Sequence, residues 1–258
     1  MGVCVWRSCV RKFYHSILIL IPPHPPPHTR APTYSHQMFS GVRGVSAVVM
    51  DGKGHAEVVS SRFQFNHAPR GIIHLTGMGS GDLRNCTLER NTVVDGTVYV
   101  AQGSRLNVSV ATTFVGNRAY GSGGGIYLEK GALLQGGEDV VFRRNRAKKG
   151  GALWVGGSDP PTQAVTLKKT VFDHNSAVQG SDVFWVPSHS HQGEFECIAC
   201  EYLGQGSLPS GGSGGGGIRI ATTTTNYSAI STAVQQFLPY TPHTISFQLL
   251  DMYVRRAC

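Results

Sequence analysis

The sequence predicts an all-β fold, a parallel β-helix of about five to six coils, and two observations lead to this prediction. The first is a motif of phenylalanine or leucine, two variable residues and asparagine, which recurs five times between residues 63 and 185. The copies are separated by 25, 26, 28 and 30 positions, and periods in the twenties are typical of solenoids. The second is a glycine-containing, β-forming stretch after each copy, without helical spacing of apolar residues.

Short apolar runs supply the expected strands. Residues 106–110, 125–128 and 152–155 are rich in β-forming side chains and have the length of strands. The segments between such runs are too short for crossover helices, so parallel strands can close only by winding as a coil. Each strand then pairs with its copy one turn later, about 4.8 Å away.

The repeated residues have architectural roles in such a coil. Inward-pointing side chains that stack along the axis are expected at Phe63, Leu88, Phe114, Phe142 and Phe172. The repeated asparagines are expected at one corner of each coil. Either they adopt left-handed backbone angles there, or the side-chain amide of each bonds to the asparagine of the next coil. They are Asn66, Asn91, Asn117, Asn145 and Asn175. A second corner is expected near the glycines Gly71, Gly96, Gly124, Gly125, Gly150, Gly151 and Gly180. Substituting such a residue should impair folding and not a reaction.

Four segments are expected along the chain. Residues 1–43 form a basic, proline-rich leader, mostly disordered, with the order of a poor secretory signal or anchor, and a mis-started reading frame is the alternative. Its apolar run is too short to span a bilayer, which takes about 20 residues. Residues 44–186 form the β-helix. Residues 187–217 contain a Cys-x-x-Cys segment and a Gly/Ser linker. Residues 218–258 resemble the first strands of an immunoglobulin-like module that stops early, which favours a fragment or a truncated gene.

The net charge of +8 is unevenly distributed. Residues 1–43 contribute +5, residues 44–185 contribute +4 and residues 186–258 contribute −1, so nucleic acid is not an expected partner. The one dense basic run is Arg143, Arg144, Arg146, Lys148 and Lys149, within a single coil. A solvated turn is the favoured interpretation of this run, and a polyanion-binding patch is the alternative.

Cys197 and Cys200 lie just beyond the repeats. A disulfide between them, or pairing with sequence elsewhere, is favoured because a solenoid end needs a cap. Zinc is the alternative, with His189 and His191 as further ligands, although the spacing matches no common zinc finger. Glycosylation sequons occur at Asn85, Asn107 and Asn226, and the last is the best candidate because it lies in the tail.

No catalytic set is evident in the sequence, although many parallel β-helices act on polysaccharides. The acids are isolated apart from Glu138-Asp139. Asp159, Asp173 and Asp182 could approach one face of the last coils, but solvated turn acids are the favoured interpretation. We therefore expect no enzymatic activity and no cofactor. A polysaccharide lyase, hydrolase or epimerase with a site of scattered residues is the alternative.

The Phe-x-x-Asn motif paired with a Gly-Gly-Ala-Ile-like segment resembles the repeat of chlamydial polymorphic outer membrane proteins. Gly180 to Trp185 is similar to the closing repeat of that family, and similar repeats occur in surface proteins of algae and other protists. The resemblance covers about half the chain. It implies a right-handed parallel β-helix in a secreted or cell-envelope protein, located at the outer membrane and adhesive in the bacterial members.

The expected function is that of a secreted or cell-surface repeat protein with a structural, adhesive or glycan-binding role. Its expected partners are polysaccharides or other cell-surface proteins. Tyr99, Tyr127 and Trp154 would line a flat sheet face if they point outward, and packing in the core is the equally open alternative. A gene remnant without independent activity is a third interpretation.

Overall fold

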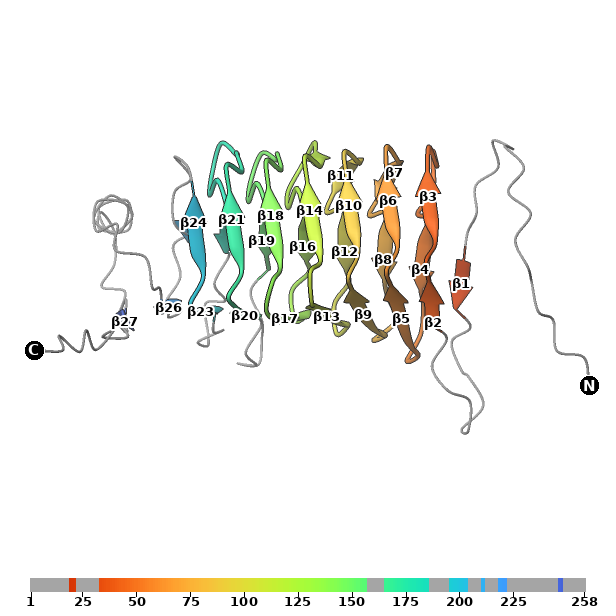
Figure 1. The fold of residues 1–258 in the computed structure, drawn as a ribbon, viewed down its shortest axis with the longest axis horizontal. Coiled ribbons are helices and arrows are strands. Elements are labelled where there is room, and N and C mark those ends of the chain that lie inside the picture. Colours follow the sequence, from red (N-terminus) through yellow and green to blue (C-terminus); the bar gives the residue numbers. More distant parts are fainter. Residues whose placement is uncertain are drawn as a thin grey trace, which may run out of the picture.

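The chain forms a parallel β-solenoid of about six turns, which confirms the predicted all-β solenoid (Figure 1). The computed structural model describes residues 19–21, 33–156, 165–185, 195–203, 210–211, 218–221 and 246–247. These described residues contain strands, turns and bends and no helix. Each strand pairs in parallel with its copy in the neighbouring turn, so the strands form flat walls along the solenoid axis.

Four sheets form these walls. Sheet A contains β1 (Ile19–Ile21), β4 (Val48–Met50), β8 (Ile73–Leu75), β12 (Val98–Val100), β16 (Ile126–Leu128), β19 (Leu153–Val155), β22 (Val183–Trp185) and β25 (Ser210–Gly211). Sheet B contains β2 (Thr33–Ser35), β5 (His55–Val59), β9 (Ser80–Arg84), β13 (Arg105–Ser109), β17 (Leu133–Gly136), β20 (Val165–Lys168), β23 (Phe195–Ile198), β26 (Ile218–Ala221) and β27 (Ser246–Phe247). Sheet C contains β3 (Met38–Ser40), β6 (Arg62–Gln64), β10 (Thr87–Glu89), β14 (Thr113–Val115), β18 (Val141–Arg143), β21 (Val171–Asp173) and β24 (Glu201–Leu203). Sheet D is short, with β7 (His67–Arg70), β11 (Thr92–Asp95) and β15 (Arg118–Ala119).

A column of rings from sheet C fills the core. Phe114 stacks on Phe142 and Phe142 on Phe172, with ring centroids 4.7 and 5.3 Å apart. The five predicted inward positions are all fully buried, including Leu88, which interrupts the aromatic column. Stacked rings in register gain contact energy beyond their buried area and hold successive turns in the same alignment.

The asparagine side chains turn inward and form a continuous ladder. In a representative step, Asn91 Nδ2 donates to the Phe63 carbonyl of the previous turn at 2.9 Å and to Asn117 Oδ1 of the next turn at 3.0 Å. The Asn117 Oδ1 atom also accepts from the Asn91 backbone N–H at 3.0 Å. The same pattern links all five repeat asparagines. Every amide hydrogen and oxygen of the inner ladder therefore has a partner, as burial requires.

The left-handed residue at this corner is the residue before the asparagine, and not the asparagine. Positive φ angles occur at Phe65, Arg90, Gly116, Arg144 and His174. The asparagines keep ordinary backbone angles because their amides must point into the core. The left-handed alternative for the asparagines was therefore wrong, and the amide-ladder alternative describes the corner.

The glycines of the third turn are shifted by one residue from the predicted alignment. Ile126 pairs with Leu153, which places Gly123 beside Gly150 and Gly124 beside Gly151. Gly123 adopts the left-handed corner with φ of 65°, like Gly150 at 61°. A Cβ at Gly124 would lie 2.1 Å from the Gly151 carbonyl oxygen, so close packing between turns requires glycine there.

The solenoid extends beyond the predicted limits of 44–186. Strands β2 and β3 belong to the segment assigned to the leader, and Phe39 stacks on Phe63 at 4.7 Å. At the other end, β23 and β24 belong to the segment assigned to the Cys-x-x-Cys region, and Tyr202 stacks on Phe172 at 5.1 Å. Both outer turns add a ring to the same core column, which explains why they join the repeat.

The described strands of the tail also continue the solenoid. Strand β26 pairs in parallel with β23, and β27 pairs in parallel with β26. An immunoglobulin-like module would pair such strands antiparallel. The pairing therefore differs from the partial immunoglobulin-like segment expected for residues 218–258.

Replacing Asn91 with alanine should destabilise the solenoid by about 3–5 kcal/mol, because it leaves the Phe63 carbonyl and the Asn66 amide groups buried without their partners. Urea unfolding followed by circular dichroism measures this change. Asn107→Ala is the matched control, since Asn107 lies on the outer face of β13, and a loss within about 1 kcal/mol is expected. Equal losses in the two variants would contradict a role of the ladder.

Candidate binding surface

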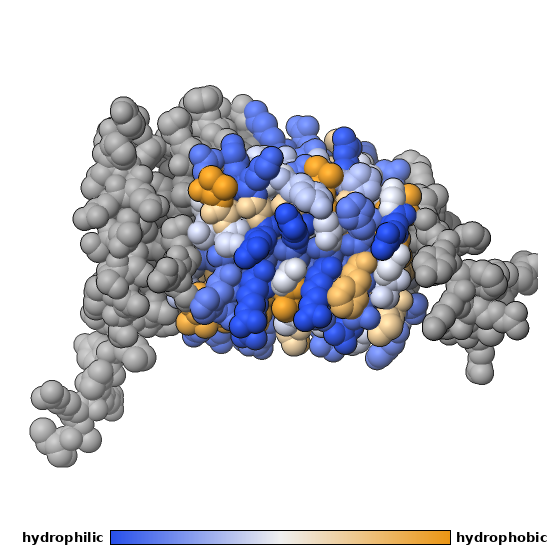
Figure 2. Space-filling view, turned by 90° about the horizontal axis from the view of Figure 1, so that it is seen from above, coloured by the Kyte–Doolittle hydropathy of each residue, from blue (hydrophilic) through white to orange (hydrophobic). Residues whose placement is uncertain are grey.

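The corner at sheet D carries the densest group of exposed cations in the described part of the chain. Asn145 and Ala147 face inward, so the alternating residues Arg144, Arg146 and Lys148 face solvent. Arg118, in the preceding turn, lies beside Arg146 as its bridge partner. We call Arg118, Arg144, Arg146 and Lys148 the basic corner. Figure 2 views the solenoid from the side of β7 and β11 and shows a face that is mainly hydrophilic, with isolated hydrophobic residues.

The acids that the structure describes do not neutralise the basic corner. Within the described residues, none of the four side chains has a carboxylate within 4.0 Å. Arg118 instead lies over the Tyr120 ring, with 5.2 Å between the guanidinium carbon and the ring centroid. Arg143 differs because it faces sheet C and pairs with Asp173 at 2.6 Å. The basic run of the sequence is therefore divided among Arg143, which is paired with Asp173, Lys149, which lies 5.4 Å from the Phe184 ring centroid, and the cations of the basic corner.

The aromatic side chains singled out in the sequence point outward from sheet A. Tyr99 stacks on Tyr127 at 5.0 Å, and Tyr127 stacks on Trp154 at 4.2 Å. Stacking covers both faces of Tyr127 and one face each of Tyr99 and Trp154, and Tyr99 is only 7% exposed with its hydroxyl bonded to Glu129. Burial and the hydrogen bond to Glu129 raise the pKa of Tyr99. Sugar rings bind to open aromatic faces, so this column is better suited to hold adjacent turns together.

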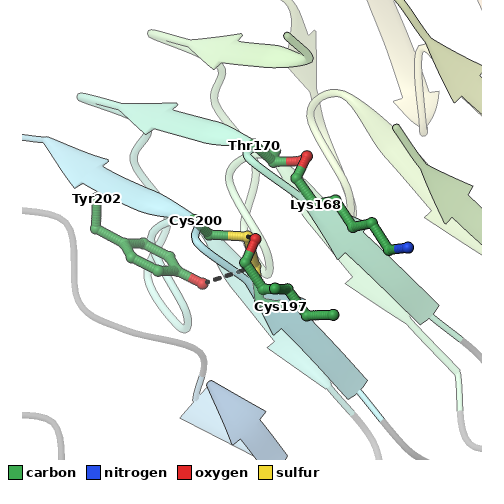
Figure 3. The surroundings of a disulfide bond; sticks show 6 residues. Lys168, Thr170, Cys197, Cys200 and Tyr202 are labelled. Atoms are coloured by element: carbon green, nitrogen blue, oxygen red, sulfur yellow. Dashed lines mark hydrogen bonds between the residues drawn. A yellow bond between two sulfur atoms is a disulfide. The ribbon is translucent and has the colours of Figure 1, made fainter. Parts of the chain in front are cut away.

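Cys197 and Cys200 form a disulfide inside the last described turns (Figure 3). Both side chains are fully buried, and the Tyr202 hydroxyl lies 3.6 Å from the Cys197 sulfur. The bond crosses the corner between β23 and β24. Thiolates are the form that binds zinc, so the disulfide leaves no such ligand here. His189 and His191 lie outside the described residues, and the described residues contain no group of three metal-ligating side chains.

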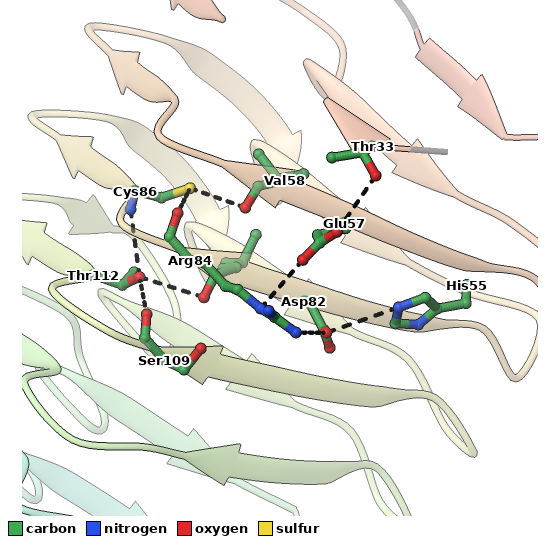
Figure 4. A network of polar contacts seen from close by, with 10 residues as sticks. Thr33, His55, Glu57, Val58, Asp82, Arg84, Cys86, Ser109 and Thr112 are labelled. Carbon is green, nitrogen blue, oxygen red and sulfur yellow. Dashed lines mark hydrogen bonds and ion pairs between the residues drawn. The ribbon is translucent and has the colours of Figure 1, made fainter. Parts of the chain in front are cut away.

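The outer face of sheet B brings together two carboxylates that are 25 positions apart in the sequence (Figure 4). Glu57 and Asp82 are register partners on β5 and β9, and the acids are therefore less isolated than the sequence indicated. Arg84 binds Glu57 through Nε at 3.2 Å and Asp82 through Nη2 at 3.0 Å. His55 Nε2 lies 3.8 Å from Asp82. A substrate would have to displace Arg84 to reach both carboxylates.

Asp182 ends the asparagine ladder and is not the solvated turn acid that the sequence favoured. Its Oδ1 atom accepts from Asn175 Nδ2 at 2.9 Å, while Oδ2 is buried without a hydrogen-bond partner. Burial, with the nearby charge of Asp173, raises the pKa of Asp182 to about 7. Asp173 is partly accessible, and its pKa is lowered by His174 and Arg143. Asp159 lies outside the described residues.

The described sequons differ in position. Asn85 is exposed in the turn after β9, has φ of 51°, and donates to Ser60 Oγ at 3.0 Å. Asn107 lies within β13, on the outer face of sheet B. Asn226 lies outside the described residues. Asn85 is therefore the more accessible of the two described sequons.

The comparison with protein families identifies the repeat. Residues 111–129 match the Chlamydia polymorphic membrane protein repeat, and they span β14, β15 and β16. This stretch includes Phe114 of the core column and Asn117 of the ladder. No curated protein and no solved structure matches the chain. The chain thus carries a repeat of the polymorphic membrane protein type on a β-solenoid, and both features indicate a cell-surface repeat protein. No helix among the described residues is long and apolar enough to cross a membrane.

Asp182→Asn should flatten the dependence of the unfolding free energy on pH between about pH 4 and pH 7. The pKa of Asp182 is about 7 in the folded protein against an ordinary value of 3.8, so its contribution to the free energy of unfolding is fully present below about pH 4. It is lost as the pH rises towards 7, because the unfolded chain ionises first. Urea unfolding across this range measures the slope.

Asp173→Asn is the matched control, because Asp173 makes the free energy of unfolding depend on pH in the opposite direction. The pKa of Asp173 is lowered in the folded protein, so its contribution is present above its ordinary pKa and is lost as the pH falls. This variant should be less stable than the wild type at neutral pH, and the difference in stability should disappear in acid. Parallel pH profiles of Asp182→Asn and the wild type would contradict the assignment to Asp182.

Proposed function

We propose that the chain is a non-enzymatic adhesive module of a cell-surface protein and that the basic corner is its contact face. The repeat type and the solenoid support the location at a cell surface. The observation that carries the adhesive role is the group of exposed cations on one corner that no carboxylate of the described residues pairs with. Surfaces that serve only for solubility usually mix both signs of charge, whereas this corner does not.

The scaffold beneath the corner supports this proposal. Asn145 holds the chain between Arg144 and Arg146, and its amide is bonded to the turns on both sides. The backbone of Arg146 is also hydrogen-bonded to the Asn117 carbonyl at 2.8 Å. A backbone that is already fixed needs no further ordering when a partner binds, so less of the binding energy is spent on ordering.

Polysaccharide cleavage is the second candidate function, because Glu57 and Asp82 lie side by side on sheet B. Paired carboxylates are the catalytic groups of most glycoside hydrolases. The ion pairs of Arg84 with both acids fit a structural cluster that offsets repulsion between neighbouring carboxylates. We therefore place adhesion first.

Adhesion without turnover should be seen when the purified chain is applied to an array of neutral and acidic glycans. We expect retained binding to at least one glycan class, and no new reducing ends or unsaturated uronate after prolonged incubation with the bound glycan. Asn91→Ala, which removes one step of the asparagine ladder next to Arg118, tests whether binding requires the intact solenoid. Retention of no glycan by the folded chain would contradict the proposed function.

The double variant Glu57→Gln/Asp82→Asn separates the two candidate functions. Glycan binding should remain within about twofold of the wild type, because the sheet B network lies outside the basic corner. Binding titrations and product assays on the same glycans provide the measurement. Product formation by the wild type that this variant abolishes would establish cleavage in place of adhesion alone.

A further inference from the structure

We infer that the basic corner binds an anionic polysaccharide, through the sulfate or carboxylate groups of its sugar units. This inference rests on the proposed adhesive function and names the chemistry of its partner. Four features of the corner support it: a pair of like charges, a narrow shape, a predominance of arginine, and neighbouring acids that are already engaged.

The like-charge pair is the first feature. Arg118 and Arg146 face each other across neighbouring turns, where parallel strands are about 4.8 Å apart. Like charges directly opposite destabilise a sheet. No carboxylate of the described residues relieves this pair. An anionic ligand placed between the two guanidinium groups would convert this repulsion into attraction.

The shape of the patch favours a thin, linear ligand. Arg144, Arg146 and Lys148 alternate along one short segment, which runs from the left-handed bend at Arg144 to the bend at Lys148. Arg118 widens the patch by one turn. The corner therefore matches a few consecutive sugar units, and repeated attachment along one polymer would raise the overall affinity by avidity.

The side-chain chemistry favours oxyanion groups on the ligand. Three of the four cations are arginines, whose planar guanidinium groups bind carboxylates and other oxyanions through two parallel hydrogen bonds. The contact of Arg118 with Tyr120 restricts one of these side chains in advance. Tyr120 itself is 49% exposed, and its ring can contact a sugar edge beside the charged groups.

The acids nearest the corner are already engaged. Asp173 binds Arg143 and His174, and Asp95 accepts a hydrogen bond from the Ser122 backbone at 2.8 Å. These carboxylates therefore satisfy other groups and do not neutralise the corner. The missing negative charge has to come from outside the described residues.

Two other polyanions fit the corner less well. Single-stranded nucleic acid requires aromatic faces on which bases stack, and the guanidinium of Arg118 lies over the Tyr120 ring. Anionic lipids are concentrated in the cytoplasmic leaflet, whereas the repeat type indicates a cell-surface protein. Polysaccharides are the polyanions that a surface module meets.

The triple variant Arg118→Gln/Arg146→Gln/Lys148→Gln tests the site. Calorimetric titration with heparin as a sulfated probe and polygalacturonate as a carboxylate probe should show at least about tenfold weaker binding at fixed salt. Wild-type binding should weaken as sodium chloride is added. The same titrations with dextran, an oligothymidine and vesicles containing phosphatidylserine identify the class of ligand.

The matched control removes the same net charge elsewhere. Lys53, Arg105 and Lys168 are exposed cations outside the corner, and their triple glutamine variant should retain polysaccharide binding within about twofold. Arg146→Gln alone offers a second readout. It should raise the Tm by relieving the pair with Arg118 and should still weaken polysaccharide binding, an outcome that misfolding cannot produce.

The outcomes separate this inference from the proposed function. Loss of anionic polysaccharide binding in the corner variant alone supports the inference. Equal losses in both triple variants, or tighter binding to the oligothymidine or to the vesicles, would overturn it. Binding of neutral glycans only would overturn the inference and leave the adhesive function in place, whereas binding of no probe and no array glycan would overturn both.

Discussion

The asparagine ladder is the interaction on which the rest of the structure depends. Each amide of the ladder before Asn175 joins three turns, because it donates to a carbonyl of the turn before and to an amide of the turn after. Inside the protein such bonds are strong, and an unmatched partner is costly, so the ladder fixes one register for the whole corner. That register also decides which residues face solvent, and it brings Arg118 beside Arg146.

A ladder of this kind needs an acceptor at its last step, and the protein provides Asp182 there. The register partners of Asp182 in earlier turns are Ala152 and Gly125, so the carboxyl group belongs to the ladder's end and not to the repeat. Its burial links the stability of the final turns to pH. The disulfide and Tyr202 close the core at the same end. The terminal turns thus use chemistry that the inner turns do not need.

The repeat in the sequence was sufficient to predict the solenoid, the inward rings and the five asparagines, because inner turns all obey the same packing rule. The outer turns were missed because the pattern changes there: valine at position 42 replaces the asparagine after Phe39, and tyrosine at 202 replaces phenylalanine.

The candidate binding surface could be predicted only in part from the sequence. The run from Arg143 to Lys149 is local in sequence, but the proximity of Arg118 appears only once the register is known. Likewise, the burial of Asp182 depends on the ladder and not on its neighbours in sequence.

Hydrogen exchange of side-chain amides, followed by NMR, tests the ladder most directly. Exchange only through global unfolding is expected for the ladder NH₂ groups, because both hydrogens of each are bonded inside the core: Asn66, Asn91, Asn117, Asn145 and Asn175. The NH₂ groups of Asn85 and Asn107, on the outer surface, should exchange rapidly. Ladder amides that exchange as fast as those of Asn107 would contradict a buried, fully hydrogen-bonded ladder.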